Sequence, residues 1–411
     1  SVVGTVSGEA TAVGSNFASM APGAAEVLNY EVYNFIDEIY DGEEEDQQTI
    51  PAEIINQSWS YTDKNQTDQA SYDVPFDNYA AETNTLFVTS AGDDGVVLSP
   101  ATMYNGIAVA AYNNGGSAGT ASGPTYGGRS KPDITAIANE TSFSAPEVSA
   151  AAAVLLEAAQ RGDAGPGTES DASDARVLKA LLLNGATKPT GWSNTPTQPL
   201  DPNWGAGILN VYNSYENLAA GEYAPTSSCA GSLHSQSSTT VLPNEGWDLA
   251  SFTNVRPILY YEGQANYYQF DLSSSVASSF TLSSTLIWWL EANQTQINNI
   301  YLYLYDSDTG QQIAVSDSTV DNVQQLYVTD LAPGDYDLVV YKAGGLLTTN
   351  GGKMASATDT YALAFNFAPN TSSSVSTPAL SIQPVPEPSE ILLLIAAAGV
   401  PVLSGMRRRK S

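Results

Sequence analysis

The spacing of apolar residues changes near residue 220, and this change constrains the fold more than any other feature of the sequence. Before it, short apolar runs such as Leu86–Ser90 and Ile107–Ala111 alternate with glycine-rich loops and helical stretches. Alternating strands and helices favour a layered α/β domain with a mostly parallel sheet. After it, only short strand-like runs follow, separated by turn residues, and this pattern predicts an all-β sandwich.

Two helices are expected in the first domain. Residues 145–161 contain no Gly or Pro after Pro146 and are apolar nearly all round, as in a buried helix. A second helix is expected from Asp174 to Asn184, with Ser173 as its N-cap and Gly185 as its stop.

Composition divides the 411 residues into five segments. We expect an α/β domain at 1–220, a Ser/Thr/Pro-rich linker at 221–239, a β-sandwich at 240–369, a second linker at 370–384 and a tail at 385–411. The strands of the sandwich are expected near 267–272, 300–305, 326–328, 336–341 and 361–367.

Acidic residues dominate the charge, which is −30 at neutral pH. Such a surface repels phosphate backbones, so we expect no nucleic-acid partner. The single cysteine, Cys229, excludes an intrachain disulfide. Nothing in the sequence implies an organic cofactor.

The C-terminal tail carries its own signal. Val385-Pro386-Glu387-Pro388 precedes an apolar run from Ile391 to Met406, and the basic residues Arg407–Lys410 follow this run. The apolar run is at the short end for crossing a bilayer, which takes about 17–25 residues. This ordered combination resembles the PEP-CTERM sorting signal of bacteria. The resemblance implies export, a short transmembrane helix, processing by an exosortase-type enzyme, and release or attachment at the cell surface; an ordinary membrane anchor is the alternative.

Ser142 stands where the Ala-rich helix begins, in Asn139-Glu140-Thr141-Ser142-Phe143-Ser144-Ala145-Pro146. A serine there lies near unpaired backbone N–H groups and the positive end of the helix dipole. Such groups stabilise the oxyanion that forms when a hydroxyl attacks a carbonyl. The alternative is that Thr141 or Ser142 is only an N-cap.

Seven segments together resemble the subtilisin-like serine peptidases of family S8, and they occur in the order of that family. They are Met20–Ala24, Ile54–Ser60, Val88–Gly95, Ser99–Ala110, Gly128–Ile134, Thr141–Val148 and Trp204–Asn210. The resemblance implies a serine endopeptidase acting on protein or peptide substrates through an acyl-enzyme on Ser142. It places Asp93 at the oxyanion position. It also implies that Ser58, Trp59 and Ser60, together with Ala91 and Gly92, hold an extended substrate by strand addition.

A catalytic triad also needs a base and an acid that orients it. In this family the order is Asp, His, Ser, and Ser1–Val6 looks like the end of the histidine segment. We therefore expect both partners to precede Ser1, in a chain truncated at its N-terminus. The only histidine, His234, follows Ser142 in the Ser-rich linker and is expected at the surface. A non-catalytic homologue that acts by binding, as a surface or matrix protein, is the alternative.

Three residues depart from the family pattern. Asp93 stands where the family usually has Asn, and its carboxylate would repel an oxyanion unless it were protonated. Glu140 replaces the usual Gly and Glu147 the usual His. The stretch from Asp133 to Ser142 is also shorter than usual.

Three further features each allow two interpretations. The acidic run from Asp37 to Asp46 offers oxygen ligands for calcium, with a solvated loop as the alternative. Asp306–Gly310 is expected to be a hairpin turn rather than a calcium loop. Trp288 and Trp289 are expected in the core, with carbohydrate contact as the alternative.

Overall fold

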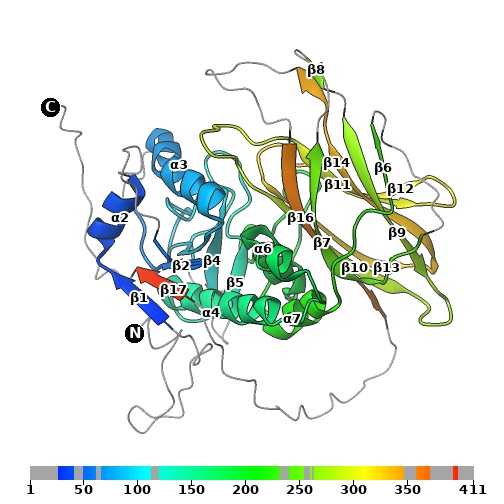
Figure 1. The fold of residues 1–411 in the computed structure, drawn as a ribbon, viewed down its shortest axis with the longest axis horizontal. Coiled ribbons are helices and arrows are strands. Elements are labelled where there is room, and N and C mark those ends of the chain that lie inside the picture. The colour runs from blue at the N-terminus through cyan, green and yellow to red at the C-terminus, as the bar shows by residue number, and fades with distance from the viewer. Residues whose placement is uncertain are drawn as a thin grey trace, which may run out of the picture.

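Two layered bodies make up the molecule, one built on a parallel sheet and one a β-sandwich (Figure 1). The computed structural model describes residues 26–40, 50–61, 66–112, 120–230, 233, 240–253, 260–261, 263–346, 358–370 and 392–396.

A six-stranded sheet forms the centre of the first domain, and every neighbouring pair of its strands is parallel. Its order is β1-β17-β2-β3-β4-β5. The strands are β1 (Glu26–Tyr30), β2 (Ile54–Gln57), β3 (Leu86–Ser90), β4 (Gly106–Tyr112), β5 (Ile134–Ile137) and β17 (Leu392–Ala396). The predicted α/β domain with a mostly parallel sheet is thus confirmed.

Helices cover both faces of this sheet. They are α2 (Val32–Tyr40), α3 (Gln66–Thr83), α4 (Thr141–Gln160), α5 (Glu169–Ala172), α6 (Ala175–Gly185) and α7 (Val211–Ala219). The first predicted helix is α4, which begins earlier than expected, at Thr141. The second is α6, but its N-cap is Asp174, whose Oδ1 accepts the Arg176 N–H. The prediction of Ser173 as the cap was wrong.

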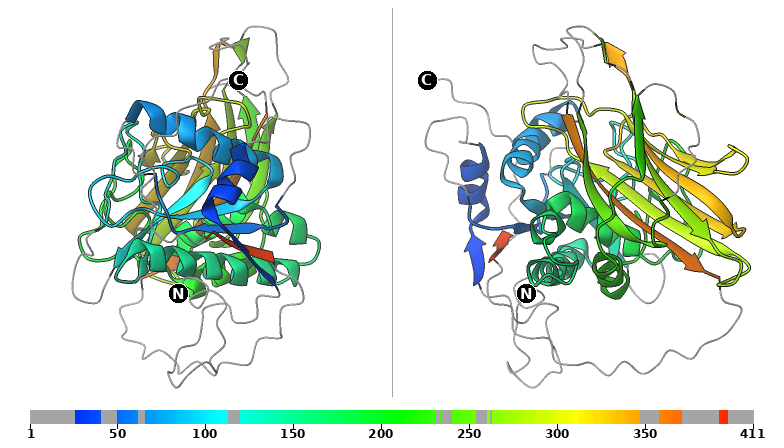
Figure 2. Two further views of the ribbon diagram at one scale, coloured as in Figure 1. Left: turned by 90° about the vertical axis from the view of Figure 1, so that its left-hand side faces the viewer. Right: turned by 45° about the vertical axis from the view of Figure 1, so that its right-hand side comes forward.

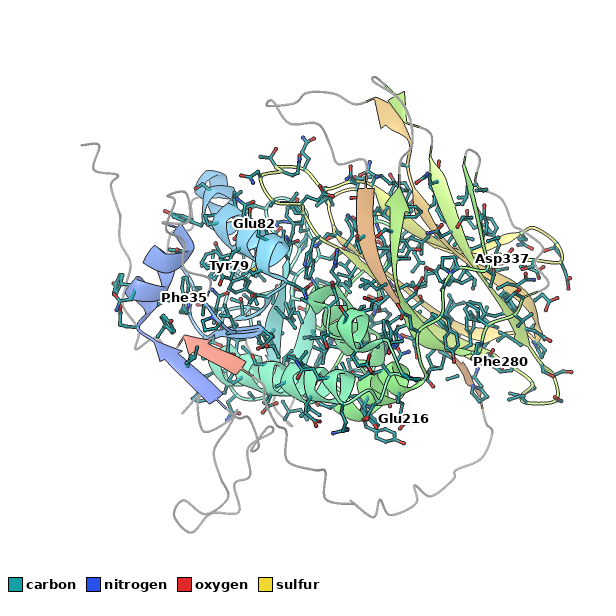
Figure 3. The ribbon with its side chains drawn as sticks, in the orientation of Figure 1. Phe35, Tyr79, Glu82, Glu216, Phe280 and Asp337 are labelled. Atoms are coloured by element: carbon teal, nitrogen blue, oxygen red, sulfur yellow. The ribbon has the colours of Figure 1, made fainter. Side chains whose placement is uncertain are left out.

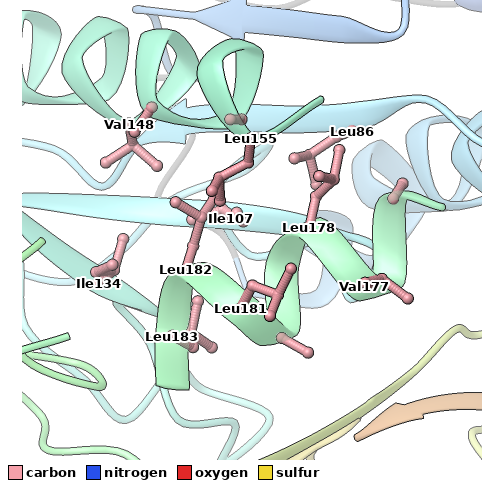
Figure 4. Close-up of a cluster of buried hydrophobic side chains, with 14 of the residues drawn as sticks. Leu86, Ile107, Ile134, Val148, Leu155, Val177, Leu178, Leu181, Leu182 and Leu183 are labelled. Carbon is pink, nitrogen blue, oxygen red and sulfur yellow. The ribbon is translucent and has the colours of Figure 1, made fainter. Parts of the chain in front are cut away.

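Alternate residues of the strands point to opposite layers. Ile54 and Leu86 lie in one buried cluster with α4 and α6 (Figure 4). Their neighbours Ile55 and Phe87 lie in another cluster, together with Phe76 of α3. Figure 3 places Phe35 and Tyr79, of the same cluster, in the helical layer farthest from the sandwich. The sheet is therefore buried on both sides, as all-parallel sheets are.

The C-terminal apolar run does not match its prediction where it is described. Residues Leu392–Ala396 form strand β17 rather than part of a helix, and they lie between β1 and β2 (Figure 2). A short run of Leu and Ile is compatible with a strand as well as with a helix. The rest of the run lies outside the described residues. In the described part of the chain, no helix is long and apolar enough to cross a membrane.

The second domain is a β-sandwich of two antiparallel sheets, as predicted. One sheet has the order β13-β10-β16-β7 and the other β12-β11-β14-β9-β6. The strands are β6 (Ser227–Ala230), β7 (Glu245–Thr253), β9 (Gln264–Leu272), β10 (Phe280–Trp288), β11 (Ile300–Asp306), β12 (Gln312–Ser316), β13 (Val323–Leu331), β14 (Gly334–Lys342) and β16 (Thr358–Pro369). A two-stranded ribbon joins β8 (Tyr260–Tyr261) and β15 (Gly345–Leu346). Strand β6 falls within the predicted linker and pairs with β9.

The two domains share one core. The buried cluster of α4 and α6 also contains Trp247, Ile287 and Trp289 of the sandwich. Polar contacts cross the same boundary: the Ser283 hydroxyl donates to the Asn184 side-chain oxygen at 3.0 Å. The sandwich thus packs directly on α6, which lies between it and the parallel sheet (Figure 1).

Candidate active site

Ser142 lies in the first turn of α4, with its side chain partly buried and Phe143 beside it exposed. Glu140 precedes the helix in an extended conformation, but its side chain makes no capping hydrogen bond. The first N–H groups of a helix have no partner within the helix. In α4 the Phe143 and Ser144 N–H groups donate to the Glu140 carbonyl, at 3.0 and 3.2 Å, so the Ser142 N–H is the donor of the first turn that faces the site together with the partial positive charge of the helix.

Asp93 supplies the cap that Glu140 does not. It follows β3, and its Oδ1 accepts the Thr141 N–H at 2.8 Å and the Thr141 hydroxyl at 3.0 Å. The Gly92 N–H donates to the same hydroxyl at 3.2 Å. These bonds fix the start of α4 against the end of β3, and so they position the residue that follows Thr141.

This contact defines what Asp93 does chemically. Its carboxylate acts as a hydrogen-bond acceptor at the helix N-terminus, whereas an oxyanion site needs donors. The negative charge also offsets part of the positive end of the α4 dipole. Asp93 thus lies next to Ser142 through its bonds to Thr141, in an arrangement that binds the helix rather than an anion.

Ser58 connects the end of β2 to the same place. Its hydroxyl donates to the Ser142 carbonyl at 2.9 Å and accepts from the Asn56 amide at 3.0 Å. The Asn56 side-chain oxygen in turn accepts the Ser149 hydroxyl at 3.0 Å. This chain of hydrogen bonds ties β2 to α4 at two points one to two turns apart, so the backbone of Ser142 is held from both sides.

The Trp59 side chain belongs to the core. It is 7% exposed and contacts the rings of Tyr61, at 5.2 Å, and Phe76, at 6.2 Å, between centroids. Its size and burial anchor the segment that continues from β2. Ser60 is partly buried. A substrate could therefore be held by the main chain of Ser58–Ser60, but not by the indole of Trp59.

The predicted strand addition at Ala91 and Gly92 needs correction. The Ala91 N–H donates to the Val109 carbonyl, and the Gly92 carbonyl accepts the Ala121 N–H. With the Gly92 N–H bonded to Thr141, neither residue has a main-chain donor left for an added strand. Gly92 is instead bonded to Thr141, the residue before Ser142. The positive φ of Gly92, 102°, is a conformation that glycine adopts without strain.

A buried ion cluster surrounds Asp133 in the same domain, and the sequence did not reveal it. The Asp133 carboxylate contacts the Lys131 ammonium at 2.6 Å and the Lys179 ammonium at 3.2 Å. It also accepts the Ala108 N–H at 2.7 Å. Burial opposes ionisation of Asp133, but the two ammonium groups outweigh burial and lower its pKa. Asp133 therefore acts in the fold, joining β4 and α6, and not at the nucleophile.

Glu147 lies on α4 a little more than one turn after Ser142 and is half-buried. Burial raises its pKa to about 7, and the hydrogen bond from the Ile137 backbone opposes this rise. Its carboxyl group therefore changes charge near neutral pH, close to the helix terminus that carries the site.

Other candidate positions lie away from this site or outside the described residues. His234 and residues 41–46 of the acidic run are not described, and neither are the side chains of Asp37 and Glu38. No group of three His, Cys, Asp or Glu suited to a metal occurs in the described residues. Asp306 caps a turn by accepting the Thr309 N–H at 2.8 Å, as expected of a hairpin. Trp288 and Trp289 are buried, which confirms the core interpretation.

Comparison with known proteins supports this view of the first domain. Residues 4–207, just under half of the chain, match the family model described as Subtilase family. No curated protein sequence matches the chain.

Solved structures give weaker likenesses. Tripeptidyl peptidase 2 is 11% identical with a TM-score of 0.32, over 81% of this chain and 36% of its own. The pre-peptidase C-terminal domain of a collagenase from Bacillus anthracis is 21% identical with a TM-score of 0.19, over 29% of this chain and 87% of its own. The chain thus spans about a third of tripeptidyl peptidase 2, and neither score is high enough to carry an argument.

The parallel sheet covered on both faces, the nucleophile position at the start of α4 and the family match all concern the same part of the chain. The first domain is therefore a subtilisin-like domain, carrying the match to the Subtilase family over residues 4–207, and the β-sandwich follows it.

Proposed function

We propose that this chain is the nucleophile-bearing part of an exported subtilisin-like serine endopeptidase, with Ser142 as the nucleophile. The observation that carries the proposal is the position of Ser142 at the N-terminus of α4, inside the region that matches the Subtilase family. Its carbonyl is held by Ser58, and the residue before it is held by Asp93. Both contacts fix the position of the backbone that carries the Ser142 hydroxyl.

The reaction that this arrangement serves is acyl transfer. The Ser142 hydroxyl attacks the carbonyl carbon of a peptide bond while a base takes its proton, and the carbonyl oxygen becomes an oxyanion. The C–N bond then breaks, and the proton passes to the departing amine. Water attacks the acyl-enzyme in the same way and releases the acid product. The Ser142 N–H, in the first turn of α4, is the donor that would stabilise the oxyanion, because its neighbours Thr141, Phe143 and Ser144 already donate to Asp93 and to the Glu140 carbonyl.

Acyl transfer on Ser142 also needs a base and an acid that orients it. The one histidine, His234, belongs to the Ser-rich segment after the first domain and is not proposed as the base.

Export and sorting are part of the same proposal. The Pro-Glu-Pro motif at Pro386–Pro388, the apolar run and the basic end support processing by an exosortase-type enzyme and a final place at the cell surface. Transient membrane attachment through the tail is the expected route. Replacing Pro386, Glu387 and Pro388 by alanine leaves β17 in place and should abolish processing, whereas unchanged processing and location would contradict this part of the proposal.

A second candidate function is favoured by one contact. Because Asp93 places an acceptor where the family usually has a donor, the fold could act by binding polypeptides without cleaving them. Such a protein would sit at the cell surface or in a matrix, with the same substrate-like partners.

An assay of protein cleavage distinguishes the two functions. The full-length protein is incubated with denatured casein, and new N-termini are counted by mass spectrometry. The peptidase proposal predicts cleavage that is lost in Ser142→Ala and retained in Ser144→Ala, a buried serine of the same helix. Absence of cleavage by the full-length wild-type protein, or equal cleavage by the Ser142→Ala variant, would contradict it.

A further inference from the structure

A row of tyrosines lines the outer side of the five-stranded sheet of the sandwich. Along β11, Ile300, Leu302 and Leu304 are buried in the sandwich core. Because side chains alternate along a strand, the residues between and after them point outward. We call Tyr301, Tyr303 and Tyr305, together with Tyr341 on the neighbouring β14, the tyrosine face.

The rings of the tyrosine face are close enough to form one aromatic surface. Ring centroids are 6.5 Å apart for Tyr301 and Tyr303, and 6.0 Å apart, in a stacked arrangement, for Tyr303 and Tyr305. The Tyr341 ring lies 6.5 Å from both Tyr301 and Tyr303. Tyr301, Tyr303 and Tyr341 remain partly accessible, whereas Tyr305 and Val339, which pairs with Tyr303 on the same face, are buried in a small cluster against which Tyr303 and Tyr341 pack. The face therefore offers aromatic surface to a ligand.

A carboxylate with an unsatisfied oxygen accompanies these rings. Within the described residues, Asp317 Oδ1 is buried and has no hydrogen-bond partner. Ser316 of β12 pairs with Leu302 of β11, so Asp317, the next residue, lies beside Tyr301 at the end of the antiparallel pair. In keeping with this position, burial first, and then the charge of Asp317, raise the pKa of Tyr303 to about 12. A buried carboxylate oxygen without a donor is costly, and a donor from a ligand would remove that cost.

The charge around the tyrosine face has one sign. At the end of the sheet, burial and the carboxylates of Asp271, Asp308 and Asp306 raise the pKa of Asp335. Among the described residues of the sandwich, the one cation is Lys342, which is buried and paired with Asp359. The face is therefore acidic, with no positive side chain of the described sandwich available to neutralise Asp317.

We propose that the tyrosine face binds an extended polypeptide by taking a Lys or Arg side chain over Tyr301 and Tyr303, with its charge beside Asp317. A cation over an aromatic ring is attracted by the electrons of the ring, and a guanidinium can also donate to the unsatisfied carboxylate oxygen. A neutral ligand could stack on the rings but would leave the charge of Asp317 uncompensated. This site does not depend on the peptidase reaction, since it lies in the other domain.

Fluorescence anisotropy of the full-length protein tests the proposal. The probes are two fluorescein-labelled decapeptides, one of alternating Gly and Arg and one of alternating Gly and Glu. The Arg peptide should bind, with affinity that falls as salt is added, and the Glu peptide should not. Equal binding of both peptides, or no binding of the Arg peptide at low salt, would overturn the proposal. Binding of chitohexaose in competition with the Arg peptide would instead point to a carbohydrate site.

Variants locate the binding. Tyr303→Leu should weaken binding about two- to fivefold, because it removes one ring, whereas Tyr303→Phe should retain binding, because it keeps the ring. Asp317→Asn should weaken binding most at low salt. Tyr212→Leu and Glu82→Gln replace exposed residues of the other domain and should leave the affinity unchanged. If Tyr303→Leu fails to fold by circular dichroism, Asp317→Asn decides, and its equality with the Glu82→Gln control refutes the site.

Discussion

The two domains expose their strands in opposite ways. In the subtilisin-like domain, β3 is buried at every position, because helices cover both faces of the parallel sheet. In the sandwich, β11 alternates between buried and partly exposed positions from Ile300 to Leu304, because Tyr301 and Tyr303 on the outer face of its sheet stay partly accessible. The difference indicates where each domain can act: the first at the ends of its strands, where loops and the α4 terminus meet, and the second on an open sheet face.

The two domains nevertheless share one buried core. Trp247, Ile287 and Trp289 of the sandwich pack in the same cluster as the leucines of α6. The Asn105 side chain also exchanges two hydrogen bonds with the backbone of Leu290. The sandwich is thus a structural part of the subtilisin-like domain and covers a face that would otherwise be apolar.

Removing the sandwich should have the largest effect on the first domain, because the two domains share a core. A chain lacking residues 240–369 keeps β17 but would expose the buried leucines of α6, at about 25 cal/mol for each Å² of apolar surface. We expect such a chain to aggregate, while the full-length protein unfolds in one cooperative transition by calorimetry. A truncated chain that stays monomeric and melts at the same temperature would show that the domains fold independently.

Breaking a buried ion pair in each domain gives the next largest effect. Asp133→Asn should lower the free energy of unfolding by about 3–5 kcal/mol, because it leaves Lys131 and Lys179 buried without their carboxylate. Asp359→Asn in the sandwich removes the carboxylate from one buried ammonium, that of Lys342, rather than from two, and should cost less. Urea unfolding measures both variants. An equal or larger loss of unfolding free energy for Asp359→Asn would contradict the view that the ion cluster of Asp133 stabilises the fold more than the ion pair of Asp359.

The pH dependence of stability should come in part from Asp77 in the first domain. Burial, with the nearby Asp73 carboxylate, raises the pKa of Asp77 from 3.8 to about 7. Between these values the folded state keeps a proton that the unfolded state has lost, so stability falls as pH rises through this window.

An asparagine at position 77 does not titrate and can still accept the Asn105 N–H through its side-chain oxygen. Relative to wild type, Asp77→Asn should therefore gain roughly 1 kcal/mol or more of stability between about pH 5 and about pH 8. Urea unfolding across this range measures the gain. Exposed Glu82→Gln is the control, and parallel pH profiles for all three proteins would rule out the effect.

The smallest expected effect concerns the helix cap at the candidate site. Asp93→Ala removes the acceptor for Thr141 and should cost about 1 kcal/mol, whereas Asp93→Asn keeps an acceptor and should cost only a few tenths. Thermal unfolding compares the two variants. A large loss for Asp93→Asn would show that the charge, and not the hydrogen bond, holds the start of α4.

The sequence predicted the elements whose apolar pattern is unambiguous. Helix α4 and strands β3 and β4 are nearly continuous apolar segments, and they were found where expected. Helix α3 was missed because its sequence is polar and contains Pro75, so its helical state depends on packing against the sheet. The apolar run around Leu392–Ala396 was expected to be helical, since short apolar runs do not distinguish helix from strand.

The candidate site could likewise be predicted only in part from the sequence. Motif order along the chain brought Ser142, Asp93 and Ser58 to attention, and the structure places them together. The detail that Asp93 accepts from Thr141 depends on how the loop after β3 folds against α4, and no spacing in the sequence encodes it. For the same reason Lys179, a partner of Asp133 from a distant helix, could not be predicted.

Labelling with a fluorophosphonate probe tests the central claim most directly. The full-length protein is treated with the probe, digested, and searched for the adduct by peptide mass spectrometry. The account predicts an adduct on Ser142 that is absent in Ser142→Ala and present in Ser144→Ala. A full-length protein that carries no adduct on Ser142, or that carries it on another serine, would contradict the assignment of Ser142 as a nucleophile.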